Sequence, residues 1–556
     1  MKSMLSRAWS ARVAAAFGVA TVVSVQALAP AQAAAVDGGW TRTHTLSFPV
    51  AGALKLGELP AATPLHIVVG LKLNNREDLD SFLARQMTPG NPLFGARLTS
   101  EQFVSRYSPT NAQVRAVTDY LNAYGFTNIK VAANRLIVEA DTTAASVSSA
   151  FNTQLSQFRL NDRTVFANTR DVHVPAPLSN IVLSVLGLQT FEKAHTMIEK
   201  AEASTQVGPA KGFLPTEFPK VYNAVGYPDG SGTDVAIISA GSMTQTLKDL
   251  RQFESENGLM QVPVNLVPVG PLSSDSSGTP EWDLDSQNIT GMAGNTSTSK
   301  GVSSLTFYTA TSLADSALTP TYNKAVIDNF AKVINVSLGE CELVAYTSGA
   351  MATDDQIYAQ ASAQGQTFMV SSGDSGSQQC SAIRGPTVSY PASSPYVMTL
   401  GGTSLYADSY DNYVSESTWS GTGGGISQVE AAPSWQQSYL GATKRLVPDF
   451  AMDADPNTGS KIVVNGNHAQ YGGTSLSAPL ATGVWARFES WVNNGIGFAP
   501  PVLYYIAKYI PTPMTPFHDV KTGSNGAYTA ATGFDYTTGY GSFDVGAIFT
   551  DEGYTP

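Results

Sequence analysis

The sequence predicts an α/β protein in which a parallel sheet flanked by helices follows a smaller α+β domain. The chain has 556 residues, which is more than one hydrophobic core usually absorbs, so at least two folded units are expected. Hydrophobic residues make up 43% of the chain and charged residues only 14%, as in compact globular proteins. From residue 233 onward, apolar strand-like runs alternate with helix-like stretches, and this alternation is typical of a parallel sheet covered on both faces.

The first 33 residues have the pattern of an export signal. Basic residues at Lys2, Arg7 and Arg12 precede or open a largely apolar run, 13–29, which ends near small residues at 31–33. We therefore predict a bacterial-type signal peptide over 1–33 and a secreted protein that has no membrane attachment after cleavage. An uncleaved anchor is the alternative, but the apolar run is short for a bilayer span.

Net charge and cysteine content narrow the class further. The formal charge of -12 and the pI near 5.0 argue against nucleic acid as a partner, because no basic surplus is available to neutralise phosphates. The chain has two cysteines, Cys341 and Cys380. One even pair in an exported chain favours a disulfide over metal ligation, and two free buried thiols remain the alternative.

The segment from about 64 to 190 has the size and pattern of a small separate domain. Strands are expected over 65–73, 128–131, 135–140 and 181–186, and helices over 76–86, 111–124 and 143–151. Apart from one extra helix, this order is close to the ferredoxin-like arrangement. The segment gathers no catalytic residue types, so we expect a folding or inhibitory module within residues 34–194. Residues 195–212 turn polar and lose the hydrophobic period, which fits a processing linker.

The remaining chain, 213–556, contains the expected parallel sheet. Strands are predicted over 234–240, 264–270, 304–310, 333–339, 367–372 and 397–405, with helices over 244–256 and 354–364 among those between them. In such sheets, functional residues gather at the carboxyl ends of the strands.

The most specific motif is Gly-Gly-Thr-Ser-Leu-Ser-Ala-Pro over 472–479, followed by a helix-like run, 480–491. The glycines allow close backbone approach, and a helix that begins near Ser475 directs backbone N–H groups at an anion formed beside its hydroxyl. We interpret Ser475 as a nucleophile, whereas Thr474 and Ser477 shape the turn. A turn that merely caps a helix is the structural alternative.

Histidine usage argues against a Ser-His-Asp triad. Of the six histidines, only His468 and His518 follow the expected linker. His468 lies seven residues before Ser475 and has no obvious orienting acid, and His518 lies in a C-terminal loop that fits a metal site better.

Carboxylates offer a replacement base in Glu-Trp-Asp-Leu-Asp, 281–285. On a helix, Glu281 and Asp285 share one face, whereas Asp283 points elsewhere. Two adjacent carboxyls tend to hold one proton between them, and a serine activated by such a weak base is expected to work in acid. An ordinary solvated acidic helix face is the alternative.

A third element is Ser-Ser-Gly-Asp-Ser-Gly, 371–376, at the end of a predicted strand. An Asp in such a tight turn often only stabilises the turn, by hydrogen bonds from its side chain to nearby backbone, and this is the alternative for Asp374. In acid, however, its protonated carboxyl could donate a hydrogen bond to a developing oxyanion.

These three motifs together resemble the sedolisin family of serine-carboxyl peptidases, closest to the pepstatin-insensitive pseudomonalisin and xanthomonalisin group. Residues 98–103 also resemble the pro-kumamolisin activation domain, and 215–219 resemble the start of the mature enzymes. The resemblance covers nearly everything after the signal peptide. It implies a subtilisin-like catalytic fold and a disulfide between Cys341 and Cys380.

The resemblance also implies roles for single residues. Ser475 is the nucleophile, Glu281 the general base, Asp285 its orienting partner and Asp374 the oxyanion partner. The implied activity is acid-acting hydrolysis of proteins or peptides by a secreted monomer that is made as an autoprocessed proenzyme, with its own propeptide as intramolecular inhibitor.

A calcium site is implied near the C-terminus, in a loop over about 517–544. The expected ligands of one structural Ca²⁺ are two carboxylates and three backbone carbonyls, with oxygen-only ligation that suits this ion: Asp519, Val520, Ala531, Gly533 and Asp535. The sequence departs from the family in the short spacing between the two Asp residues and in Ala531, which stands where relatives often have Gly.

Another departure is Leu338, which stands where many relatives have Trp in a Ser-Trp-Gly motif. Because of Leu338, the substrate preferences of those relatives cannot be assumed for this chain. The four expected catalytic residues are unaffected. Two rival functions are disfavoured by the sequence. A noncatalytic binding protein with this fold would not need the four polar site residues Glu281, Asp285, Asp374 and Ser475. An esterase or lipase would need Gly-x-Ser-x-Gly followed by Asp and His, which this chain does not provide.

Overall fold

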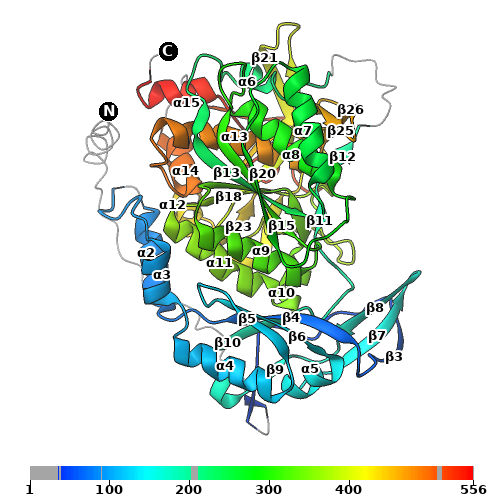
Figure 1. Cartoon of the computed structure of the whole chain (residues 1–556). Helices are drawn as coiled ribbons and strands as arrows, with labels where there is room; N and C mark the ends of the chain where they lie inside the picture. Colours follow the sequence, from blue (N-terminus) through cyan, green and yellow to red (C-terminus); the bar gives the residue numbers. More distant parts are fainter. Residues whose placement is uncertain (1–34, 37–38, 89, 202–210, 510–515, 555–556) are drawn as a thin grey trace.

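The computed structural model describes residues 35–36, 39–88, 90–201, 211–509 and 516–554. The predicted signal peptide, 1–33, lies outside these residues. Figure 1 shows a smaller N-terminal domain, coloured blue to cyan, beneath a larger domain coloured green to red. Among the described residues, no helix is long and apolar enough to cross a membrane.

The N-terminal domain is built on a four-stranded antiparallel sheet of order β10-β4-β6-β5. Helices α4 and α5 connect these strands, so the chain order and the sheet order are those of a ferredoxin-like fold, as predicted. The elements are β4 (Pro64–Leu71), α4 (Asn111–Ala123), β5 (Thr127–Val131), β6 (Ile137–Thr143), α5 (Ala144–Ala150) and β10 (Val182–Leu186).

Two small sheets in this domain were not predicted. They contain β3 (Leu54–Glu58), β7 (Leu155–Leu160) and β8 (Arg163–Asn168) in one, and β1 (Ala35–Val36), β2 (Trp40–Arg42) and β9 (His173–Pro175) in the other. A short 3₁₀ turn, η1 (Ala176–Leu178), precedes β10.

Two helices of the N-terminal domain, rather than the one predicted, lie outside the ferredoxin-like unit. Helix α2 (Arg76–Gln86) has the predicted bounds, and α3 (Ser100–Tyr107) begins at a capping box formed by Thr99 and Gln102. Both pack against helix α11 (Ala350–Gln364) of the larger domain, and buried Phe103 belongs to that domain's apolar core. These helices therefore join the two domains.

The larger domain contains an eight-stranded sheet of order β14-β15-β13-β16-β18-β20-β21, with β24 also paired to β20. All pairs are parallel except β20 with β21. The strands are β13 (Gly230–Ala240), β14 (Val264–Val269), β15 (Val302–Ala310), β16 (Val333–Val336), β18 (Thr367–Ser371), β20 (Met398–Ala407), β21 (Tyr413–Thr418) and β24 (Phe450–Asp453). The predicted run 333–339 splits, because the chain leaves the sheet after Val336 and forms the separate strand β17 (Leu338–Cys341).

Helices α8 and α13 pack together and α13 crosses the centre of the sheet, whereas α9 and α11 lie on the side facing the N-terminal domain (Figure 1). The helices of this domain are α6 (Phe218–Val221), α7 (Thr244–Glu256), α8 (Thr279–Met292), α9 (Asp315–Asp328), α10 (Glu342–Ser348), α11 (Ala350–Gln364), α12 (Ser434–Leu440), α13 (Thr474–Trp491), α14 (Ala499–Tyr509) and α15 (Val545–Asp551). The short strands are β11 (His195–Thr196), β12 (Glu199–Lys200), β17 (Leu338–Cys341), β19 (Ser389–Tyr390), β22 (Gly425–Ala431), β23 (Lys444–Val447), β25 (Ser460–Val464), β26 (Asn467–Gly472), β27 (Phe517–His518) and β28 (Ser542–Phe543).

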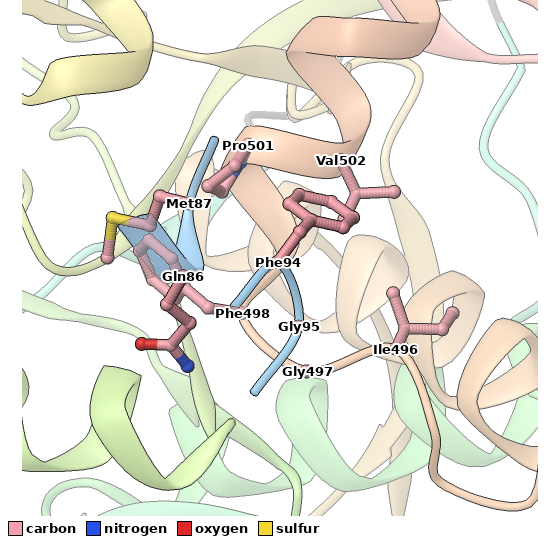
Figure 2. A pocket seen from close by; sticks show the side chains of 9 residues that line it. All are labelled: Gln86, Met87, Phe94, Gly95, Ile496, Gly497, Phe498, Pro501 and Val502. Carbon is pink, nitrogen blue, oxygen red and sulfur yellow. The ribbon is translucent and has the colours of Figure 1, made fainter. Parts of the chain in front are cut away.

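The two domains are in direct contact along several elements. Strand β4 packs on α9 and strand β10 on α11. The backbone N–H of Leu73 donates to Gln356 Oε1 at 2.8 Å, and the Arg97 guanidinium donates to the Asn494 carbonyl at 2.6 Å. A pocket at this interface is lined by four residues of the N-terminal domain and five of the larger domain (Figure 2): Gln86, Met87, Phe94, Gly95, Ile496, Gly497, Phe498, Pro501 and Val502. None of the predicted catalytic residues lines it.

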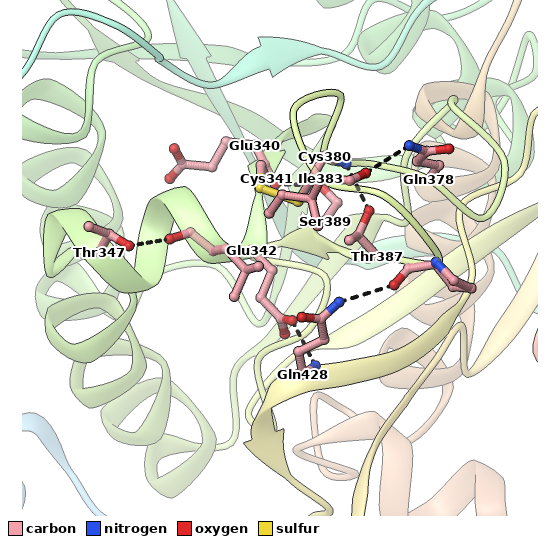
Figure 3. Close-up of a disulfide and its surroundings, with 12 residues drawn as sticks. Glu340, Cys341, Glu342, Thr347, Gln378, Cys380, Ile383, Thr387, Ser389 and Gln428 are labelled. Atoms are coloured by element: carbon pink, nitrogen blue, oxygen red, sulfur yellow. Dashed lines mark hydrogen bonds between the residues drawn. A yellow bond between two sulfur atoms is a disulfide. The ribbon is translucent and has the colours of Figure 1, made fainter. Parts of the chain in front are cut away.

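The predicted disulfide between Cys341 and Cys380 is confirmed (Figure 3). Their Cα atoms are 4.8 Å apart. Cys341 ends β17, so the disulfide fastens that strand to the loop that contains Cys380. The Cys380 N–H donates to the Thr387 hydroxyl at 2.9 Å, which holds the loop in place.

Candidate active site

The predicted nucleophile, Ser475, lies in the first turn of α13 and is fully buried. Gly473, directly before the helix, has φ 91°, a conformation that disfavours residues with a Cβ. A Cβ at Gly473 would lie 2.2 Å from the carbonyl oxygen of Met197 and 2.5 Å from Asp374 Oδ2. The glycine therefore lets another segment of backbone approach Ser475, as the motif predicted.

The predicted carboxyl pair, Glu281 and Asp285, lies on helix α8 with both side chains buried. Asp285 Oδ1 accepts a hydrogen bond from the Ser337 hydroxyl at 2.6 Å. Burial raises the pKa of Asp285 to about 8, although hydrogen bonds from Ser337 and Asn335 lower it. Burial also raises the pKa of Glu281 well above its usual value, the Asp285 charge raises it further, and the Ser475 hydroxyl lowers it. The pair therefore holds a proton readily.

Asp374 follows strand β18 and faces the start of α13. Its Oδ1 accepts two hydrogen bonds of 2.7 Å from Thr474, one from the backbone N–H and one from the hydroxyl. Its Oδ2 has no hydrogen-bond partner among the described residues. Burial raises the pKa of Asp374 to about 8, so the side chain is protonated in acid. A proton on Oδ2 would make this oxygen a donor.

Asp283, His468 and His518 contact groups outside this cluster, whereas the charge of Glu199 lies near enough to raise the pKa of Asp374. Asp283 points elsewhere, as predicted, toward Asp249 and Thr246. His468 is exposed on β26, with its Nε2 3.1 Å from a carboxylate oxygen of Glu256. His518 stacks on the Tyr413 ring at 3.7 Å between centroids.

Sequence reasoning missed Ser337 and Met197, which both contact the site. Ser337 follows strand β16 directly, so the rule that functional residues gather at carboxyl ends of strands could have found it. Met197 lies in the segment interpreted as a polar linker. Its described residues 195–201 include two short strands, β11 and β12, and the backbone N–H of Ser475 donates to the Met197 carbonyl at 3.0 Å.

The five residues expected to bind calcium lie in one loop after β27. Asp519 Oδ1 accepts from the Gly533 N–H at 3.0 Å, and Asp535 Oδ2 accepts from the Ala531 N–H at 3.0 Å. These N–H groups belong to the peptides that join 530 to 531 and 532 to 533, so each carboxylate is hydrogen-bonded one peptide away from a carbonyl expected as a ligand. Two carboxylates and three backbone carbonyls would make an all-oxygen donor set, which suits Ca²⁺. Lys521 Nζ lies 3.4 Å from Asp519 Oδ2. Among the described residues, no cluster of three or more His, Cys, Asp or Glu could hold a metal, so an ion here needs backbone carbonyls.

Two family models match the chain. Residues 51–191 match the pro-kumamolisin activation domain, and residues 285–502 match the subtilase family. The second match agrees with the parallel sheet and with the helix α13 that carries Ser475.

Individual proteins are similar over far more of the chain. Sedolisin of Pseudomonas sp. (strain 101) is 43% identical, over 92% of this chain and 92% of its own. Xanthomonalisin of Xanthomonas sp. (strain T-22) is 42% identical, over 95% of this chain and 70% of its own. The solved structure of Pseudomonas sedolisin, a serine-carboxyl proteinase complexed with two molecules of pseudo-iodotyrostatin, is 44% identical with a TM-score of 0.58 and covers 62% of this chain and all of that one. With a buried serine beside a buried carboxyl pair, and with this similarity along nearly its whole length, the chain belongs to the sedolisin family of serine-carboxyl peptidases.

Proposed function

We propose that this protein is a secreted endopeptidase that hydrolyses peptide bonds of proteins in acid, through an acyl-enzyme at Ser475 and with Glu281 as general base. It is made as an autoprocessed proenzyme. The observation that carries this proposal is the peptide carbonyl of Met197 at the site, which accepts the Ser475 N–H at 3.0 Å. A polypeptide therefore fits in the position that a substrate would need.

Each polar residue has a distinct role in this proposal. Glu281 accepts the proton of the Ser475 hydroxyl as its oxygen attacks the carbonyl carbon. Asp285, which is hydrogen-bonded to Ser337, orients Glu281 and shares a proton with it. The Ser475 N–H and protonated Asp374 donate to the oxyanion. Water then hydrolyses the acyl-enzyme.

The protonation state that Asp374 needs sets an upper pH limit on the proposed activity. Its pKa of about 8 leaves the donor in place below that pH and removes it above. The Glu281 base must be ionised, and burial is the largest cause of its raised pKa. Hydrogen bonds with the Ser475 hydroxyl and with the Met197 backbone lower this pKa, so both favour the ionised base.

The N-terminal domain acts as an intramolecular inhibitor in this proposal. The proposed organisation is a signal peptide over 1–33, a propeptide over 34–194, a processing linker over 195–212 and a peptidase domain over 213–556. Strands β11 and β12 of the linker pair with β17 and β26 on either side of Ser475, which would exclude other substrates. Protein or peptide substrates, a monomeric state and the absence of nucleic-acid or membrane partners complete the proposal.

One structural Ca²⁺ per subunit is proposed in the loop 517–544. The carboxylates of Asp519 and Asp535 and the carbonyls of Val520, Ala531 and Gly533 would hold it. The ion would stabilise the loop and take no part in the hydrolysis.

Digestion of an unfolded protein across acid to mildly alkaline pH tests the function. The wild type is compared with Ser475→Ala and Glu281→Ala after equal treatment in acid. We expect the wild type to digest protein only in acid and both variants to be inactive. Digestion that peaks near neutrality, or that survives Glu281→Ala, would show that another group is the base.

A further inference from the structure

The linker crosses the site as an extended strand held on both sides of Ser475. Strand β11 pairs antiparallel with β17, and strand β12 pairs antiparallel with β26. The two residues between β11 and β12 are Met197 and Ile198. Addition of a strand to exposed edges is a common way to bind a peptide in a fixed register. The pairing therefore fixes which peptide group meets the serine.

Both sides of the Met197 backbone are held by the site. Its N–H donates to the Ser337 carbonyl at 3.3 Å, and its carbonyl accepts from the Ser475 N–H at 3.0 Å. The Met197 oxygen and Asp374 Oδ2 both lie within 2.5 Å of the position that a Cβ on Gly473 would take. The carbonyl oxygen therefore accepts from one donor proposed for the oxyanion and lies near the other.

We propose that the Met197–Ile198 peptide bond is a self-cleavage site of the proenzyme, and that the acyl side of the site accepts long apolar side chains that have no branch at Cβ. This inference rests on the proposed function. Ser475 Oγ forms a bond to the Met197 carbonyl carbon and its proton passes to Glu281. The C–N bond to Ile198 then breaks, and the proton passes to the Ile198 nitrogen. Water hydrolyses the ester, which leaves a carboxyl group on Met197 and restores the Ser475 hydroxyl.

The Met197 side chain is buried, and its end lies against Gly339. It is 1% exposed. A Cβ on Gly339 would lie only 2.4 Å from Met197 Cε, so the end of the side chain extends over this glycine. A flexible thioether chain fills such a narrow space easily. A β-branched side chain is wide at its base, and a carboxylate would be buried there without a partner.

Time-resolved mass spectrometry of the acidified full chain tests the cleavage site. The chain is purified near neutral pH and sampled after acidification, with Ser475→Ala as the control that stays uncut. Early fragments that end at Met197 and begin at Ile198 are expected, with a rate constant independent of chain concentration. First cuts elsewhere, while this bond stays intact, would overturn the inference.

Substitutions at Met197 test the side-chain preference. Met197→Leu keeps an apolar side chain without a branch at Cβ and is expected to be cut within about threefold of the wild-type rate. Met197→Val and Met197→Asp are expected to slow cleavage of this bond at least tenfold, or to move the first cut to another bond. Equal rates for Met197→Asp and Met197→Leu would contradict the preference.

A paired substitution tests whether Gly339 limits the length of the side chain that fits at position 197. Gly339→Ala brings a methyl group toward Met197 Cε and also toward Ser389 Oγ, so it is made in a Ser389→Ala background. It should slow cleavage of the Met197 chain, and Met197→Ala in the same background should restore the rate because the shorter side chain ends before Gly339. The absence of restoration would show that Gly339 does not contact the cleaved residue.

Failure of this inference can be told apart from failure of the proposed function. A wild-type chain that digests added protein in acid but never yields an N-terminus at Ile198 refutes only the self-cleavage site. A chain that digests nothing at any pH refutes the proposed peptidase activity as a whole.

Discussion

Asp374 and Thr474 are joined by two hydrogen bonds to a single carboxylate oxygen. Oδ1 accepts from both the N–H and the hydroxyl of Thr474, each at 2.7 Å. This arrangement aims the other oxygen, Oδ2, at the side of the site where the Met197 carbonyl lies. Two donors on one oxygen leave the proton of the neutral acid to the other. Asp374 is thereby positioned as a donor rather than as a charge.

Substitutions of Asp374 test this donor. Asp374→Ala should lower kcat about 10²-fold to 10³-fold, as expected when one oxyanion donor is lost. Asp374→Asn should retain much more activity, since an amide oxygen can accept from Thr474 while the NH₂ group donates in place of Oδ2. Its activity should also persist above about pH 8, where wild-type Asp374 ionises. The measurement is kcat for peptide hydrolysis against pH. Equal losses in the two variants would mean that Asp374 supplies no hydrogen bond.

Ser337 offers a test of the carboxyl pair. Its hydroxyl donates to Asp285 Oδ1 at 2.6 Å and lowers the pKa of that carboxyl by stabilising its charge. Ser337→Ala should therefore raise the pKa of the pair and move the acidic limb of the kcat profile to higher pH. Ser371→Ala, which removes a buried hydroxyl at the end of the neighbouring strand β18, is the matched control. If the acidic limb does not shift in Ser337→Ala, the Ser337 hydroxyl does not influence the titration of Glu281 and Asp285.

The identity of the catalytic residues could be predicted from the sequence more completely than the backbone segments that pack against them. Glu281 and Asp285 could be found because helical spacing fixes their common face. Ser475 could be found because its glycines and the helix after it form a local motif. Met197 could not be found, because its contact with Ser475 depends on how the two domains pack. Helix α3 was missed because eight residues are too few to establish a helical period.

The stability of the proenzyme should fall as pH rises, and Asp283 is one identifiable cause. Burial and the nearby Asp249 raise its pKa from 3.8 to about 9. The folded state therefore binds this proton more tightly than the unfolded chain does. The resulting stabilisation is complete below the unfolded pKa and is lost progressively as pH rises toward 9. Each such proton contributes a slope of about 1.4 kcal/mol per pH unit within this window.

Urea midpoints of the inactive Ser475→Ala chain at pH 5 and pH 7 measure this dependence. Asp283→Asn keeps the shape of the side chain without a charge, so its midpoint should fall less between the two pH values. Asp162→Asn, in the exposed turn between β7 and β8, is the control and should follow the parent chain. An Asp283→Asn variant with the parent's pH dependence would show that the carboxyl does not titrate in this range.

Calcium removal tests the C-terminal loop. If the ion binds only the folded chain, it stabilises the fold by RT ln(1 + [Ca²⁺]/Kd), so a chelator should lower the melting temperature of the inactive Ser475→Ala chain. Asp519→Asn should weaken calcium binding in calorimetric titrations and make the melting temperature insensitive to chelator. Lys521→Ala should bind calcium at least as tightly as the parent, because it removes a cation that lies 3.4 Å from Asp519 Oδ2. A parent chain that neither binds calcium nor responds to chelator would indicate that hydrogen bonds from Ala531 and Gly533 to the two carboxylates suffice to close the loop.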